Sequence, residues 1–403
     1  MRKISAVIGA NFGDEGKGLV TDYLASKSSR VLVIRYNGGA QAGHTVVAPG
    51  GCRHSFHHFG SGTFAGANTF LSKYFIVNPI LFRAELEELV SKGMSRFALY
   101  PYIDKECYIS TPYDMLINQE IERKRSENKH GSCGVGINET IIRNKIPKFS
   151  LKFEDLLEMD ILVEKLKNIR DNYTKLRVAQ EFATPISKET QDLINSDGLL
   201  EHYLTDIRYM LNSCNIVTAK EIETFRYNHI IFEGAQGLML DMDYKINYPH
   251  LTPSKTGLHN IAELIDEMGL YNKIDVYFVT RAYLTRHGAG PLSGELMRPT
   301  YPEIVDLTNK ENEHQGRLRF AHLDVDLLKK NILKELELFN SFVLRTNPHL
   351  VVTCLDQVGD RIQTYNNGIL IEETIKEFVD DRLDFISRKN ILTSWGASRG
   401  KIV

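Results

Sequence analysis

The first forty residues alternate between apolar runs and polar, glycine-rich segments. Residues 4–10 (ISAVIGA) form a continuous apolar run, which is typical of a strand buried on both faces. A polar loop up to Gly18 leads into a predicted helix at 19–26, and residues 30–39 (RVLVIRYNGG) form a second apolar run that ends in glycines. A strand, a glycine loop, a helix and a strand in this order predict a parallel α/β sheet, whose ligands bind at the carboxyl ends of its strands.

Later parts of the chain repeat this pattern. Residues 229–237 (HIIFEGAQG), 274–286 (IDVYFVTRAYLTR) and 350–360 (LVVTCLDQVGD) are predicted strands, and residues 78–93 are a predicted helix with Pro79 in its first position. Residues 153–225 are charged with helical periodicity, which predicts a solvated helical insertion. We expect one α/β domain over residues 1–403, with a mostly parallel, doubly wound sheet like that of P-loop NTPases and the insertion at 153–225.

Composition narrows the class of protein. The 403 residues carry a net charge of −2 with a pI near 6.7, so no overall field attracts nucleic acid or an anionic membrane. The five cysteines include no CxxC pair, which is typical of reduced thiols in a cytoplasmic protein. We find no signal peptide and no membrane-spanning run. We therefore expect a cytoplasmic protein with small-molecule substrates.

The loop GANFGDEGKG resembles a phosphate-binding loop without matching its spacing. Gly9 precedes Gly16-Lys17 by six residues, and a glycine follows the lysine in place of Ser or Thr. Backbone amides of Gly13, Gly16 and Gly18 can still hold phosphate, with Lys17 as the cation. Asp14 then needs another role, as general base or magnesium ligand. The alternative is a polar turn that Asp14 caps.

A second glycine-rich segment, YNGGAQAGHTVV, follows the second predicted strand. Its glycines allow a close approach to a ligand, and His44 and Thr45 provide polar groups. A single loop histidine is more often structural. Because the two strands should be neighbours, Asp14 and His44 would face the same crevice as a base and an acid.

These two segments identify a family resemblance. GDEGKG, followed by AGHT, resembles adenylosuccinate synthetase, and FEGAQGLMLDMD, YPHLTPS, TRHGAGP, GRLRFAHLD and TSWGASRG resemble it in the same order. The resemblance implies a homodimeric ligase that joins aspartate to inosine monophosphate (IMP) with GTP and Mg²⁺. In that reaction a base removes the purine N1 proton, the 6-oxygen is phosphorylated, and an amine displaces the phosphate.

The resemblance also implies residue roles. Asp14 would be the base and a magnesium ligand, His44 the acid, and the Gly43 carbonyl the second magnesium ligand. Lys17 and Gln236 complete the catalytic set. His287, Arg317 and Arg319 would lie at the amino-acid site, and Arg143 would reach the partner subunit's nucleotide. The predicted nucleotide- and phosphate-binding residues are Gly13, Glu15, Gly16, Gly18, Gln41, Thr45, Arg143, Thr252, Asp356, Ser394 and Gly396.

Several positions depart from the family pattern, and they fall where substrates are selected. The departures are Gln41 for asparagine, Gly131 and Cys133 for a hydroxyl and a cation, His287 for valine, His314 and Gln315 for threonines, Cys354 for lysine, and SWGASR for STGPDR.

These departures leave alternatives open. One is the same chemistry on a different nucleotide or amino acid, since His287 and His314 leave the amino acid open. A guanine nucleotide, giving a 2-amino product, is the natural candidate, although the phage enzymes that use it lack the aspartate kept at position 14. ATP is an alternative donor, because Cys354 weakens the predicted guanine site. A non-catalytic nucleotide-binding paralogue has no use for a base and acid pair, and a simple NTPase switch fits the loop spacing poorly.

Overall fold

The computed structural model describes residues 2–125, 134–182, 184–271, 273–305, 317–340 and 345–403. Within them, the main sheet has nine strands, and all its neighbouring strands are parallel. Their order is β18 (Ile391–Thr393), β15 (Thr346–Thr353), β11 (Ile274–Arg281), β1 (Lys3–Gly9), β10 (His229–Gly237), β2 (Val31–Arg35), β5 (Asn68–Leu71), β7 (Tyr102–Asp104) and β9 (Asn215–Val217). The predicted α/β class with a mostly parallel sheet is confirmed.

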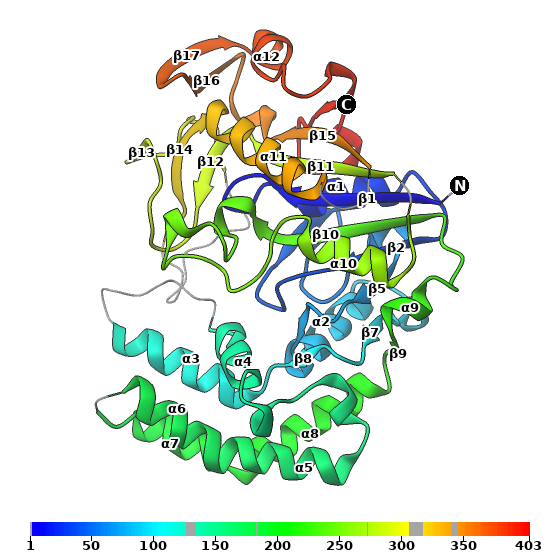
Figure 1. Ribbon diagram of the computed structural model, residues 1–403, viewed down its shortest axis with the longest axis vertical. Coiled ribbons are helices and arrows are strands. Elements are labelled where there is room, and N and C mark those ends of the chain that lie inside the picture. Colours follow the sequence, from blue (N-terminus) through cyan, green and yellow to red (C-terminus); the bar gives the residue numbers. More distant parts are fainter. Residues whose placement is uncertain (1, 126–133, 183, 272, 306–316, 341–344) are drawn as a thin grey trace.

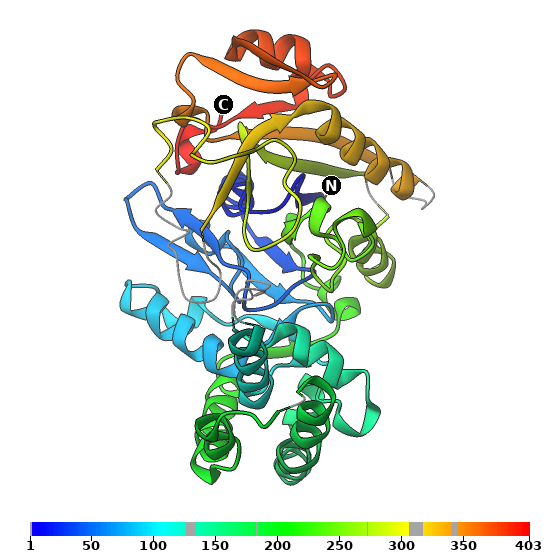
Figure 2. The ribbon, with the colours of Figure 1, turned by 90° about the vertical axis from the view of Figure 1, so that its left-hand side faces the viewer.

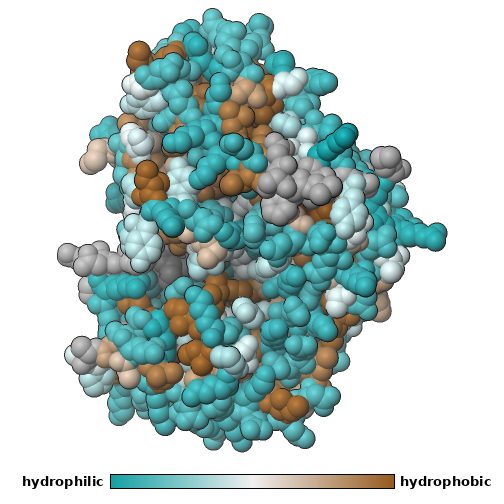
Figure 3. All heavy atoms as spheres, viewed as in Figure 1, coloured by the Kyte–Doolittle hydropathy of each residue, from teal (hydrophilic) through white to brown (hydrophobic). Residues whose placement is uncertain are grey.

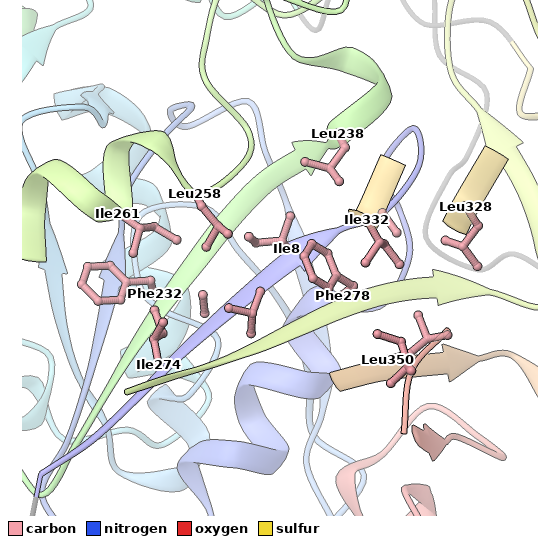
Figure 4. Close-up of a cluster of buried hydrophobic side chains, with 14 of the residues drawn as sticks. Ile8, Phe232, Leu238, Leu258, Ile261, Ile274, Phe278, Leu328, Ile332 and Leu350 are labelled. Carbon is pink, nitrogen blue, oxygen red and sulfur yellow. The ribbon is translucent and has the colours of Figure 1, made fainter. Parts of the chain in front are cut away.

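The sheet is buried on both faces, which explains its continuous apolar strands. In β1, Ile4, Ala6 and Ile8 face one core and Val7 faces the other. The first core lies under α10 (His259–Glu267) and α11 (Val325–Asn340), as Ile8, Phe278, Ile261 and Ile332 show in Figure 4. The second lies under α1 (Lys17–Ala25).

Smaller sheets flank the main one. β12 (Tyr283–Arg286), β14 (Arg319–Asp324), β16 (Arg361–Asn366) and β17 (Ile369–Thr374) form one, with β13 (Glu295–Leu296) paired to β14. β3 (His44–Val47) pairs with β4 (Arg53–Phe56), and β6 (Ile76–Val77) pairs with β8 (Tyr108–Ile109). The predicted strand at 274–286 is thus two strands, because the chain leaves the main sheet at Ala282 and enters the small one.

A helical lobe lies below the sheet in Figures 1 and 2. It contains α3 (Pro112–Arg125), α4 (Ile137–Asn144), α5 (Met159–Asn168), the π-helical turn η6 (Ile169–Tyr173), α6 (Thr174–Glu181), α7 (Lys188–Ile194) and α8 (Asp197–Leu211). The predicted insertion at 153–225 is helical up to Leu211, but it then supplies β9, an edge strand of the main sheet, and α9 (Ala219–Ile222). Its composition is dominated by the helices, which hides a three-residue strand.

Helix ends follow local chemistry. α2 (Pro79–Ser91) begins as predicted, with the Asn78 side chain accepting a hydrogen bond from Leu81 N at 3.1 Å and Pro79 in the first turn. The short helix α12 (Ile375–Glu377) has a capping box between Thr374 and Glu377. The face of the molecule in Figure 3 is mostly hydrophilic, with hydrophobic residues in small groups. Among the described helices, none is long and apolar enough to cross a membrane.

Candidate active site

The loops after four adjacent strands, β11, β1, β10 and β2, meet at one edge of the main sheet. In Figure 1 the N-terminus, where β1 starts, lies on the opposite side of the molecule from the small sheet of β12 and β14. Ligands of parallel α/β sheets bind at the carboxyl ends of the strands. The predicted site residues between Gly13 and Thr45 belong to the loops and strand starts at this edge.

The loop between β1 and α1 has a conformation that its glycines permit. Gly13, Asp14 and Gly16 all have positive φ, of 94°, 56° and 91°. Glycine adopts this conformation without strain, whereas Asp14 requires support. Arg281 Nε donates to the Asp14 carbonyl, and Thr353 Oγ1 donates to the carbonyl of Glu15 at 2.9 Å. Neighbouring strands therefore hold the loop in place.

Asp14 does not cap α1. The N-cap residue is Gly16, and it makes no side-chain capping bond. The alternative of a polar turn capped by Asp14 is therefore wrong. The helix begins at Lys17, two residues before the predicted start, so its first N–H groups lie directly at the loop, where a phosphate can bind.

Two charged side chains of the loop are buried. Glu15 and Lys17 are 3% and 4% exposed, and Glu15 accepts a hydrogen bond from Asn11 N at 2.6 Å. Burial raises the pKa of Glu15 and lowers the pKa of Lys17, whose ammonium is in turn favoured by the charges of Glu15, Asp14 and Glu233. A phosphate anion here would favour the charged form of Lys17 further.

His44 belongs to a buried charge network. Its Nδ1 lies 2.8 Å from Glu233 Oε1, and Glu233 Oε2 accepts from Ser61 N at 3.0 Å and lies 4.0 Å from Arg35 Nη1. Burial raises the pKa of Glu233, but His44, Arg35 and Ser61 bring it down to about 2. Burial lowers the pKa of His44 to about 4 against the opposing effect of Glu233. His44 is thus neutral at pH 7, with its proton on Nδ1 and a lone pair on Nε2.

Asp14 and His44 both lie within the electrostatic influence of Lys17. The charge of Lys17 acts on the pKa of each of them. A Cβ built on Gly18 would come within 3.1 Å of His44 Cβ, so the start of α1 touches the histidine. The two side chains are therefore brought to one site, Asp14 partly exposed and His44 buried.

Asp14 has a partner that the sequence did not predict. His287 Nε2 lies 3.1 Å from Asp14 Oδ2. Desolvation raises the pKa of Asp14, but the hydrogen bond and charge of His287, with the charges of Arg281 and Lys17, bring it down to about 2. His287 was predicted at the amino-acid site, and it contacts the predicted base.

The end of β10 contacts the loop after β1. Gln236 has a positive φ of 55°, and its Cα would lie 3.4 Å from a Cβ on Gly13. Gln41 approaches Gln236 near Gly38, where a Cβ would lie within 4 Å of both amide side chains. Thr252 is half-buried and donates its N–H to Leu240 O at 2.8 Å. Thr45 is half-buried on β3, directly after His44.

The predicted amino-acid residues lie around β14. Arg319 grips Glu295 with Nε and Nη2, and its Nη1 donates to the carbonyls of Gly288 at 3.0 Å and Gly290 at 2.8 Å. Arg317 is exposed two residues earlier. Gly131, Cys133, His314 and Gln315 lie outside the described residues.

The predicted donor residues lie together at the ends of β15 and β18. Leu355 N donates to Ser394 O at 3.2 Å, and Ser394 Oγ donates to Gly396 O at 3.0 Å. Asp356 is exposed in the turn that follows β15. The structure thus brings Asp356, Ser394 and Gly396 to one place.

Arg143 lies on α4, in the helical lobe and away from the loops at the sheet edge. Its guanidinium is fully buried in the helical lobe, where it donates to both Asp114 oxygens and to the carbonyls of Ile109 and Phe149. In this conformation the guanidinium is engaged within its own chain, and its predicted contact with a partner subunit's nucleotide stays a prediction. A single arginine on a helix gives no sequence signal that distinguishes a buried ion pair from an exposed ligand.

Four residues at the site were missed. Glu233 lies in the FEGAQG segment, and Arg281 and Arg286 lie in TRAYLTRHGAGP. Their positions in these motifs could have indicated that they belong to the site. Arg286 is 2% exposed and donates to His250 O at 3.0 Å and Pro291 O at 2.6 Å. Arg35, at the end of β2, gave no signal beyond an unusual charge in a buried strand.

Comparisons with known proteins agree with one family. The family model of adenylosuccinate synthetase matches residues 6–355. The chain is 32% identical over 324 residues to adenylosuccinate synthetase of Lactobacillus acidophilus, covering 78% of this chain and 70% of the relative. It is 30% identical over 362 residues to adenylosuccinate synthetase of Halothermothrix orenii, covering 88% and 81%.

Two solved structures share the fold. Fully ligated adenylosuccinate synthetase of Plasmodium falciparum aligns with a TM-score of 0.72 at 19% identity, over 100% of this chain and 99% of the other. The succinoaminodeoxyadenylate synthetase (PurZ) of cyanophage S-2L, bound to dGMP and dATP, aligns with a TM-score of 0.56 at 15% identity, over 100% and 95%. On the strength of the family model and the sequence relatives, this chain belongs to the adenylosuccinate synthetase family, whose members are ligases that form a carbon–nitrogen bond at the expense of a nucleoside triphosphate.

Proposed function

We propose that the chain joins the amine of L-aspartate to C6 of IMP, with GTP as the phosphoryl donor, to give adenylosuccinate. The observation that supports this best is the arrangement around Lys17. An ionised carboxylate, Asp14, and a neutral imidazole, His44, both lie within the electrostatic influence of this lysine, and His44 is oriented by Glu233. A binding protein has no use for a base and an acid held beside a phosphate-binding loop.

Asp14 begins the reaction by taking the N1 proton of the purine. The electron pair moves to O6, which attacks the γ-phosphorus while the bond to the β–γ bridging oxygen breaks and the nucleoside diphosphate leaves. Lys17 and the N–H groups at the start of α1 stabilise the charge on the transferring group. Phosphate charge beside His44 favours the protonated imidazole, so the ring takes up a proton from water as the nucleotides bind, and Nε2 is then a donor during phosphoryl transfer.

The amine completes the reaction. Its nitrogen attacks C6, the 6-phosphoryl group leaves as phosphate, and a proton from the amine passes to solvent. Arg317 and Arg319 are the proposed ligands for the aspartate carboxylates, because a guanidinium can donate two parallel hydrogen bonds to one carboxylate. Gln236, Gln41 and Thr252 are the proposed contacts for the purine monophosphate.

Mg²⁺ fits the residues present only as an ion shared with the substrates. Asp14 offers one ionised carboxylate and Gly43 a backbone carbonyl, and the described residues contain no group of three or more His, Cys, Asp and Glu arranged for a metal. Such a partial oxygen set is typical of Mg²⁺ that takes its remaining ligands from phosphates and water. When bound, the ion neutralises phosphate charge.

The triphosphate donor is a separate part of the proposal. Asp356 can accept hydrogen bonds from guanine N1 and N2, a pattern that adenine does not offer, which supports GTP. Cys354, whose own φ is positive at 62°, gives little surface for stacking a base, and this keeps ATP as the alternative donor.

A substrate matrix tests the proposal. The purified chain is supplied with IMP or GMP, GTP or ATP, and aspartate with Mg²⁺, and the absorbance of the succinyl product is followed. Turnover with IMP, GTP and aspartate is the expected result. Turnover only with GMP would show that the purine substrate is a guanine nucleotide. No turnover with any combination would reject the ligase function.

Assembly and location extend the proposal. A homodimer and a cytoplasmic location are supported by family membership, and residues 1–403 would act as one catalytic unit, since the site draws on strands from β1 to β18. Arg143 remains the predicted contact with a partner's nucleotide. Light scattering of the purified chain tests the dimer.

A further inference from the structure

Residues 287–295, which connect β12 to β13, make two polar contacts at the candidate site. His287, at one end, places Nε2 3.1 Å from Asp14 Oδ2. Glu295, at the other end, gives both carboxylate oxygens to Arg319, with Oε1 at 2.7 Å from Nε and Oε2 against Nη2. One short connection therefore contacts both the proposed base and the proposed amino-acid arginine.

Each contact matches the chemistry of one substrate. A ring N–H that points at Asp14 has the same donor as the purine N1–H, which the proposed reaction brings to this carboxylate. A carboxylate held by Nε and Nη2 of an arginine has the same two-point geometry as a bound aspartate carboxylate. The Nη1 group of Arg319 is engaged with Gly288 and Gly290, so Glu295 holds the forked edge that a ligand would need.

The connection is fixed at its backbone, and both side chains are partly open to water. Arg286 donates to Pro291 O at 2.6 Å, and Glu295 is paired to Ala321 of β14. The Glu295 side chain is 40% exposed and that of His287 is 20% exposed. Ion pairs open to water are weak, so a ligand carboxylate can compete with Glu295 for Arg319.

We propose that residues 287–295 are an internal pseudosubstrate, in which Glu295 competes with the amino-acid carboxylate for Arg319 and His287 competes with the purine N1–H for Asp14. The inference rests on the proposed function for the identity of the two substrates. It makes Glu295 and His287 determinants of substrate affinity. A purely structural role for Glu295 would have the opposite consequence, since Arg319 would then be better placed for a ligand when Glu295 is intact.

Competition between Glu295 and a ligand carboxylate is tested by a binding measurement that needs no turnover. Succinate, a dicarboxylate that has no amine to react, is titrated calorimetrically into the parent chain, into Glu295→Gln and into Glu303→Gln. Glu303 is an exposed carboxylate of the same region and is the matched control. The expected result is at least threefold tighter succinate binding in Glu295→Gln and parent-like binding in the control. Glu295→Ala repeats the test if the glutamine variant does not fold.

The same variants are then compared in the turnover assay. The inference expects a lower KM for aspartate in Glu295→Gln, and a lower KM for the purine monophosphate in His287→Val than in His287→Asn, which keeps an N–H donor. Unchanged or weaker succinate binding in Glu295→Gln, or no succinate binding by any protein, overturns the inference even where the parent turns over. If succinate binds more tightly to Glu295→Gln but no protein turns over, competition of Glu295 for Arg319 is supported and the proposed ligase function is rejected.

Discussion

Glu233 on β10 and His44 on β3 lie 2.8 Å apart, Oε1 to Nδ1, and neither side chain is more than 8% exposed. Ser61 N and Arg35 hold the second oxygen of Glu233. The carboxylate therefore orients the ring and fixes its proton on Nδ1, which leaves Nε2 for the substrate. This is a positioning role, separate from the role of Asp14.

Glu233→Gln tests that role. The amide keeps the shape but can present its NH₂ group to Nδ1 and so favour the wrong tautomer. We expect kcat to fall on the order of a hundredfold or more, with much smaller changes in the KM values. Steady-state kinetics with all three substrates measure the change in kcat and in each KM separately.

The fold of this variant must be checked in parallel. Removing the charge leaves Arg35 buried without its counter-ion, and the loss of one partner of a buried pair costs about 3–5 kcal/mol of unfolding free energy. Urea unfolding measures the cost, and assays are run well below the transition. A folded variant with a kcat within threefold of the parent shows that Glu233 does not position His44.

Asp14→Asn separates catalysis from binding. The amide cannot take the N1 proton, yet its oxygen can still accept from His287. We expect turnover to fall on the order of 10²- to 10⁴-fold, while binding of the purine monophosphate stays within about tenfold of the parent. Asp360→Asn, at an exposed aspartate, is the control. Turnover equal to that of the control would mean that another group is the base.

The sequence was sufficient for features formed by neighbouring residues. The loop from Gly9 to Lys17 and the helix after Asn78 depend on glycine, proline and capping chemistry that is local, and both were located correctly. The parallel sheet followed from repeated apolar runs that end in polar residues. The position of β9 could not be predicted, because three residues within a helical stretch carry too weak a pattern.

Contacts between distant residues could not be predicted in the same way. His44 and Glu233 are 189 positions apart, and His287 meets Asp14 from the other half of the chain. Their pairing depends on strand order, which places β10 and β11 on the two sides of β1. The sequence shows that these residues are polar; the fold decides which of them meet.

Gly9→Ala tests the close packing of the loop on β10. A Cβ at position 9 would lie 2.2 Å from Glu15 Oε2 and 2.6 Å from the backbone oxygen of Gln236. The Glu15 side chain can move, but the carbonyl belongs to a central strand, so the strand end must shift. We expect the unfolding free energy to fall by about 1–3 kcal/mol, with a loss of turnover as the loop and Gln236 are displaced.

Gly50→Ala is the matched control for this variant. Position 50 is exposed, and nothing lies within 4 Å of its added Cβ. Urea unfolding of the two variants and the parent measures the difference. Equal stability of both variants would show that the loop has room for a side chain at position 9.

His229 lies outside the candidate active site and makes the stability of the fold depend on pH. It is 1% exposed, its Nε2 lies 2.9 Å from Ser5 Oγ, and burial, with the charge of Lys3, lowers its pKa to about 4. The unfolded chain has the ordinary histidine pKa near 6.5 and takes up a proton first as the pH falls. The contribution of His229 is therefore present above about pH 6.5 and is lost as the pH falls toward 4. Between pH 7 and pH 5 this one group lowers the unfolding free energy by about 2 kcal/mol.

His229→Gln isolates this contribution, because glutamine keeps a polar contact for Ser5 but does not titrate. The variant is less stable than the parent at pH 7, but its unfolding free energy should fall by about 2 kcal/mol less between pH 7 and pH 5. The exposed His202, changed to Gln, should leave the parent's pH dependence unchanged. Urea unfolding at both pH values measures the change in unfolding free energy for the parent and the two variants. Parallel slopes for His229→Gln and the parent would mean that His229 becomes protonated in the folded protein as readily as in the unfolded chain.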